Sequence, residues 1–198
     1  MREIFFEPRL GENWEENRVL ILSESAYDWI GSEGEGRTPQ PSHPSGSVDH
    51  SIENFGETRY FTLMSRALCR SELPTAEQVR EAWDRCAYTI FIQETVGLGA
   101  GTRPSSEQWR AAGDPFLLLL EKLQPSKVVV TGKDMWSNMP KCSAHLSGDL
   151  QAYKLRDGRL VWCLAVPHPA NRAKGEGFRW EAVGEYIDRF KAMSFPNS

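Results

Sequence analysis

Residues 18–22 read Arg18-Val19-Leu20-Ile21-Leu22, and this short run decides the fold because no polar residue interrupts it after Arg18. Three later runs, at residues 87–92, 127–131 and 160–166, have similar lengths and are rich in β-branched and aromatic residues. An uninterrupted apolar run predicts a strand that is covered on both faces, as in a parallel sheet. The sequence therefore predicts four buried strands.

Amphipathic helical patterns lie between these runs, at residues 61–68, 75–84, 105–123 and 178–193. Thr75 stands where the second helix would begin, and Ser105 or Ser106 stands where the third would begin, so each can act as an N-cap. Strands alternating with helices predict an α/β fold, namely a three-layer αβα sandwich with a central, mainly parallel four-stranded sheet. We expect one domain over residues 1–198, because this length is too short for two ordinary domains.

Residues 31–50 differ from the rest of the chain in composition. They contain four Gly and three Pro residues, with Val48 as the one aliphatic residue. This composition predicts a mobile loop rather than a core element. Because the loop follows the first strand, at the edge where open α/β sheets bind ligands, two interpretations stay open: a lid over a site, and a surface excursion without function.

Composition and charge limit the function classes. The formal net charge is −4, so any binding to nucleic acid must use a local basic patch. The sequence has neither a signal-peptide pattern nor an apolar run of the roughly 18–20 residues that a membrane span needs. The four cysteines form no C-x-x-C pair. We therefore expect a cytoplasmic protein with free thiols and no membrane association.

Three motifs suggest cofactors and fail on spacing. The glycines of residues 97–101 follow the second strand, but Thr102 stands where a dinucleotide fingerprint needs Gly or Ala. Gly132-Lys133 lacks the upstream glycine and the following Ser or Thr of a phosphate loop, which leaves Lys133 as a simple point charge for a phosphate. Cys142 and His145 form half of a zinc site without a second half. We expect no metal and no cofactor.

Polar residues follow the first and fourth strands directly. The first strand runs into Ser23-Glu24-Ser25-Ala26-Tyr27, which supplies a carboxylate, hydroxyl groups and an aromatic ring. The fourth runs into Pro167-His168-Pro169, where a proline on each side of His168 restricts the backbone and fixes the direction of the imidazole. Since the carboxyl ends of parallel strands meet at one edge, we expect Glu24 and His168 to face one cleft.

In this order, these turns resemble those of the uracil-DNA glycosylase-like superfamily. Its members carry a G-E-A-P-G or G-Q-D-P-Y turn after the first strand and an H-P-S turn after the fourth, and the chain is most similar to a bacterial branch with a G-E-S-H-Y turn. Residues 83–93 match a W-D-R-x-A-F-Y-N-Y-V-Q segment of that branch. Arg103-Pro104 with Trp109 and Phe116, and the strand and turn at residues 128–132, also fit. The resemblance covers residues 18–190.

The resemblance implies a DNA glycosylase that hydrolyses the N-glycosidic bond of a damaged or deaminated base. His168 would donate a hydrogen bond to the departing base, Glu24 would orient or deprotonate a water, and Ser25 would help to hold that water. The expected base pocket comprises Ser23, Tyr27, Ile90 and Gln93. The expected contacts to the nucleic-acid backbone come from Lys133, Arg172 and Lys174. The implied partner is single- or double-stranded DNA, bound by a monomer without a metal.

Several positions depart from the family pattern. Ser23 replaces a glycine and Ala26 replaces a proline or histidine. Ile90 stands where relatives carry an asparagine that reads the uracil edge, and Gln93, three residues along the strand, would point to the other side. The cysteine spacing does not match the iron–sulfur ligands of one glycosylase family. Two alternatives stay open: a non-catalytic binder of nucleic acid or a modified nucleotide, and a hydrolase of free nucleosides or nucleotides.

Overall fold

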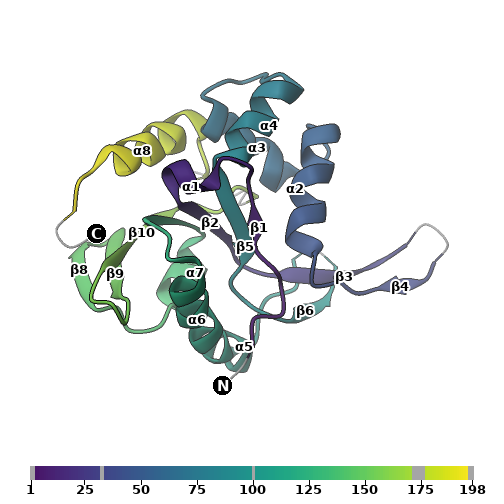
Figure 1. Ribbon diagram of the computed structural model, residues 1–198. Coiled ribbons are helices and arrows are strands. Elements are labelled where there is room, and N and C mark those ends of the chain that lie inside the picture. The colour runs from purple at the N-terminus through teal and green to yellow at the C-terminus, as the bar shows by residue number, and fades with distance from the viewer. Residues whose placement is uncertain (1–2, 32–33, 100, 171–176, 196–198) are drawn as a thin grey trace.

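The main sheet is mixed and has seven strands, as the computed structural model shows (Figure 1). The structure describes residues 3–31, 34–99, 101–170 and 177–195. The strand order is β1-β5-β2-β7-β10-β9-β8. Four adjacent strands at the centre are parallel: β5 (Cys86–Ile90), β2 (Val19–Ser23), β7 (Lys127–Thr131) and β10 (Leu160–Val166). These are the four runs that the sequence predicts as strands.

The prediction of a four-stranded sheet is wrong, because three antiparallel strands extend it. On one edge, β1 (Arg9–Leu10) pairs with β5. On the other edge, β9 (Leu150–Lys154) pairs with β10, and β8 (Ala144–Ser147) pairs with β9. The first of these strands has two residues and β8 is largely exposed, so neither carries an apolar run. A second sheet has the order β4-β3-β6 and consists of β3 (Ala26–Ile30), β4 (Gly36–Arg37) and β6 (Thr95–Leu98).

Helices cover both faces of the main sheet, and this makes the protein α/β. One face packs against α2 (His43–Glu53), α3 (Arg59–Cys69), α4 (Ala76–Asp84) and α8 (Trp180–Ala192). The other face packs against α1 (Trp14–Asn17), α5 (Ser106–Ala111), α6 (Gly113–Leu123) and α7 (Lys133–Ser137). None of the helices in the described part of the chain has the length and apolar character that crossing a membrane requires.

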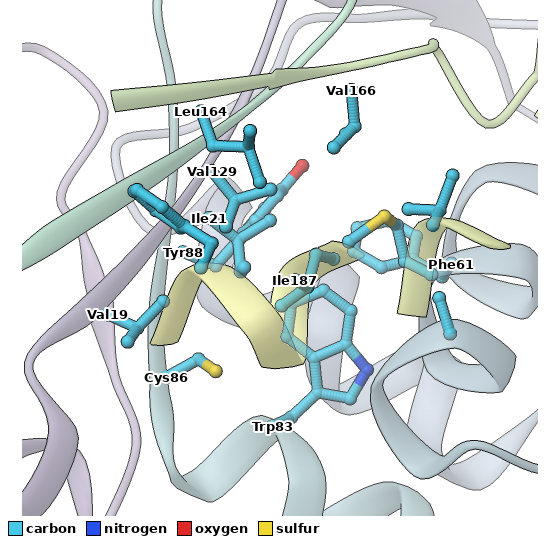
Figure 2. Packing of buried hydrophobic residues seen from close by; sticks show 14 of the residues in the cluster. Val19, Ile21, Phe61, Trp83, Cys86, Tyr88, Val129, Leu164, Val166 and Ile187 are labelled. Atoms are coloured by element: carbon cyan, nitrogen blue, oxygen red, sulfur yellow. The ribbon is translucent and has the colours of Figure 1, made fainter. Parts of the chain in front are cut away.

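Strand β2 shows why the parallel strands are apolar throughout. Val19 and Ile21 belong to the cluster on the α3 and α4 side, whereas Leu20 and Leu22 belong to the cluster on the α6 side. Successive side chains of a strand point to opposite faces, and helices cover both faces here. Figure 2 shows Val19 and Ile21 gathered with residues of the helices on the first face, including Trp83 of α4. Side chains on both faces of such a strand are therefore apolar until its last residue, Ser23.

Helix α2 corrects the expectation of a mobile loop at residues 31–50. Its residues 43–53 are helical, and Val48 and Ile52 are 0% and 1% exposed in the core. These two residues lie four apart and so share one helix face. Pro44 lies in the first turn, where a missing N–H removes no helical hydrogen bond. The glycines and prolines of this segment therefore flank or begin ordered elements, and Gly36 lies in β4.

The predicted helices are present with revised bounds. Thr75 caps α4 and Ser105 caps α5, each by a capping box with the glutamine three residues later. The single helix expected at residues 105–123 is instead two helices, with Ala112 between them. Pro115 is consistent with this break, because it has no N–H to donate to a carbonyl in the preceding turn.

Truncation of Ile52 tests whether α2 is a core element. We expect Ile52→Ala to lower the free energy of unfolding by about 2–5 kcal/mol, because it leaves a cavity beside the sheet. Ile30→Ala is the matched control: Ile30 is 56% exposed, and the loss should stay within about 0.5 kcal/mol. Urea unfolding followed by tryptophan fluorescence measures both values. Equal losses in the two variants would contradict the packing of α2.

Candidate active site

A cleft of about 2650 Å³ opens at the carboxyl ends of the parallel strands. Each of the four strands contributes a lining residue at or just beyond its end, and these are Ser23, Ile90, Gly132 and His168. Glu24 also lines the cleft. The two strand ends that the sequence singles out therefore face one cavity.

Glu24 is a buried carboxylate held by a single guanidinium. Its residue is 4% exposed. Arg103 donates from Nη1 to Glu24 Oε1 at 2.7 Å and from Nη2 to Oε2 at 3.2 Å. The same Nη2 also donates to Asp134 Oδ2 at 2.8 Å. Burial raises the pKa of Glu24 above its usual value, and the charge of Arg103 only partly offsets this. The carboxylate thus combines a desolvated position with one cationic partner.

The two serines beside Glu24 have different surroundings. Ser23 lies 2.9 Å from the Tyr88 hydroxyl, Oγ to Oη, and it donates to the Thr89 carbonyl at 3.3 Å. These bonds tie Ser23 to β5. Ser25 also lines the cleft, and its buried Oγ has no hydrogen-bond partner among the described residues. A buried hydroxyl of this kind is available to a water or a ligand. Ser25 is therefore the serine that can take part in chemistry.

His168 presents an N–H donor. Its Nδ1 accepts the backbone N–H of Ala170 at 3.1 Å, so the proton of the neutral ring is on Nε2. Burial lowers the pKa of His168, and the charge of Arg103 acts in the same direction. The ring is therefore neutral at neutral pH.

Tyr60 and Gly132 lie beside the imidazole of His168. The Tyr60 ring lies 5.6 Å from the His168 ring, centroid to centroid. The Tyr60 hydroxyl is bonded to Thr131 Oγ1 at 2.9 Å, and Thr131 in turn donates to the Leu22 carbonyl at 2.9 Å. A Cβ at position 132 would make an ordinary contact of 3.6 Å with His168 Cδ2, so it is the φ of 149°, rather than space, that favours glycine beside the ring.

The residues expected in the base pocket divide into two groups. Tyr27 and Ile90 line the cleft, and Ile90 is 2% exposed in a small cluster with Phe6 and Ala26. Gln93 is not among the residues that line it, so its expected place in the pocket is wrong. Gln93 Oε1 accepts the backbone N–H groups of Phe5 and Phe6 at 2.9 and 2.8 Å, and its Nε2 donates to the Ile90 carbonyl. The side-chain amide of Gln93 therefore binds the segment before β1.

Of the three residues expected to contact phosphates, the structure describes one, Lys133. Lys133 lines the cleft, but its Nζ lies 2.5 Å from Asp149 Oδ1, so its charge is paired. Arg172 and Lys174 lie outside the described residues. Among the described residues, no group of three or more His, Cys, Asp or Glu side chains is placed to hold a metal ion.

Sequence reasoning missed Arg103, Tyr60 and Asp134 as site residues. Arg103 lies 79 positions from Glu24, so only the fold brings them together. The one available signal was position: Arg103 lies in the segment between β6 and α5, which comes after β5, and Asp134 follows β7. Ligand-binding residues in α/β proteins concentrate at this edge.

Neutralising Glu24 is expected to stabilise the fold. A carboxyl group whose pKa is raised on folding binds its proton more tightly when folded, so its ionisation above that pKa destabilises the protein. We expect Glu24→Gln to raise Tm at pH 8 by about 2–4 °C, which corresponds to roughly 1 kcal/mol. The difference should shrink as pH falls through the raised pKa, because wild-type Glu24 then carries a proton too.

Thermal unfolding between pH 4 and pH 8 measures this effect. Glu12→Gln, at an exposed glutamate, is the control and should leave Tm unchanged. A lower Tm for Glu24→Gln at pH 8 would mean that the ion pair with Arg103 outweighs the cost of burial.

Comparison with known proteins found that no protein-family model and no curated protein matches the chain.

Proposed function

We propose that the cleft hydrolyses the N-glycosidic bond of a damaged or deaminated base in DNA. One observation carries the proposal: a neutral imidazole, whose N–H has no acceptor in the described part of the chain, and a buried carboxylate line the same cleft at the ends of β10 and β2. The turns that hold them are those in which the chain resembles uracil-DNA glycosylase-like proteins. Loss of a base leaves positive charge on the sugar and negative charge on the base, and these two groups suit those charges.

In the proposed reaction, His168 at the end of β10 acts on the departing base, and Glu24 at the end of β2 acts on the attacking water. The C1′–N bond breaks and its electron pair goes to the base, whose carbonyl oxygen accepts a hydrogen bond from His168 Nε2–H. The oxygen of a water forms the new bond to C1′, and Glu24 takes the proton of that water. Ser25 Oγ, which has no partner among the described residues, is placed to hold the water. The carboxylate also stabilises the cationic sugar.

Replacing His168 tests whether its N–H stabilises the departing base. We expect His168→Ala to lower the rate of base release by about 10²–10³-fold, the usual loss when one preorganised donor is removed. His145→Ala, at an exposed histidine of β8 that does not line the cleft, is the control and should leave the rate unchanged. The assay measures release of uracil, hypoxanthine, xanthine and mismatched thymine from single and double strands. Activity that survives His168→Ala unchanged would remove this role.

Ile90 predicts weak excision of uracil paired with adenine. A buried isoleucine leaves polar groups of the base edge unpaired, at about 1–3 kcal/mol for each group, or roughly one to two orders of magnitude in rate. Activity should favour weak pairs and single strands, where extrusion of the base costs less. Ile90→Asn should raise uracil release relative to that of the other bases. Strong excision of uracil from a uracil–adenine pair by wild type would show this interpretation to be wrong.

A non-catalytic binder of nucleic acid or a modified nucleotide is the second candidate, and the state of Glu24 favours it. Both carboxylate oxygens accept hydrogen bonds from Arg103, which leaves fewer lone pairs with which to orient a water. Retention of labelled oligonucleotides without release of any base would support this candidate. Release of a base that is lost in Glu24→Gln would support the glycosylase.

A further inference from the structure

The cleft contains an aromatic pair that the proposed reaction does not use. Trp29 of β3 and His43 of α2 both line it, with ring centroids 6.2 Å apart and ring planes inclined by 30°. The Phe6 ring lies 6.2 Å from that of His43 on centroids, which gives the pair support from the protein interior. Burial lowers the pKa of His43, so this ring is neutral at neutral pH.

The position of Trp29 points to a ligand. It is 41% exposed on the β3–β4 ribbon, which projects from the body of the protein (Figure 1). Ile30 beside it is 56% exposed, and Leu98 of the neighbouring strand β6 is 61% exposed. Of these three side chains only that of Trp29 lines the cleft, so Trp29 is the exposed aromatic side chain of the ribbon that a ligand in the cleft can contact.

The size of the cleft and two unpaired arginines that line it favour a polymeric anion as the ligand. A cavity of about 2650 Å³ exceeds the roughly 300–1000 Å³ of small-molecule sites, so it has room for several units of a polymer. Arg59 and Arg179 line the cleft, are exposed, and make no ion pair or hydrogen bond through their side chains within the described residues. Unpaired guanidinium groups and an exposed aromatic ring that line one cleft fit the phosphates and bases of a single strand.

We propose that Trp29 and His43 form a stacking subsite for a base that neighbours the excised one, in single-stranded DNA whose phosphates contact Arg59 and Arg179. This inference rests on the proposed function for the identity of the ligand. It adds that the preferred substrate is a single strand of several nucleotides rather than a free nucleotide. A stacking subsite is tolerant of sequence, because every base has an aromatic face.

Binding of undamaged strands tests the subsite separately from catalysis. Fluorescence anisotropy measures Kd for labelled oligothymidylates of two, five and ten nucleotides. We expect Trp29→Ala to weaken binding of all three strands, and that of the ten-nucleotide strand by about 5- to 100-fold, whereas binding of a labelled thymidine mononucleotide, which cannot fill two sites, should change little. Trp29→Phe keeps an aromatic face and should retain most of the affinity. Leu73→Ala, at a 77% exposed residue outside the cleft, is the control.

Salt dependence tests the phosphate contacts. Each of Arg59→Gln and Arg179→Gln should reduce the slope of log Kd against log salt concentration by about 0.7. Binding that is equal in wild type and Trp29→Ala, or binding of duplex in preference to single strand, overturns the subsite even if base release occurs. Trp29-dependent binding without release of any base supports the subsite and removes only the proposed catalysis. Failure to bind any strand overturns the subsite.

Discussion

Burial of both faces of the parallel strands is the constraint on which the cleft depends. Because helices cover each face of β2, β7 and β10, a polar side chain can be accommodated only where a strand ends. The backbone hydrogen bonds continue past those ends: Phe91 N–H donates to Ser23 O at 2.8 Å, and Gly132 N–H donates to Val166 O at 2.9 Å. Ile92 N–H also donates to Glu24 O at 3.0 Å, so the turn that carries Glu24 is held by the sheet. His168 is held instead by the bond from the Ala170 N–H to its Nδ1.

The electrostatics of the cleft centre on one guanidinium shared by two carboxylates. Arg103 contacts the buried Glu24 and the exposed Asp134, and its charge lowers the pKa of Glu24 and of His168. It thereby favours an ionised acid beside a neutral base, which is the pair of states that the proposed reaction needs. The cost of burying the Glu24 charge falls on the stability of the fold, as is common where a site needs a desolvated charge.

Sequence patterns predicted the strands and helix caps that depend on local burial and capping. They failed for elements and site residues that depend on contacts between distant parts of the chain. The bounds of β7 and β10 match their apolar runs, and Thr75 and Ser105 cap helices as expected. The strand β9 escaped notice because its polar Gln151 is satisfied inside the protein, where it donates to the Tyr153 hydroxyl at 2.8 Å. No local pattern reports that partner, nor the pairing of Glu24 with Arg103.

The order of the strands also determines when the protein can fold during synthesis. Strand β2 is made early, yet its two neighbours in the sheet are β5 and β7, which follow it by more than 60 and 100 positions. Until residue 131 has left the ribosome, one edge of an apolar strand has no partner, and pairings between distant segments form slowly. Nascent chains and fragments that stop before β7 would expose this edge, and such exposed strands aggregate. Efficient production of the protein should therefore depend on chaperones or on slow growth at low temperature.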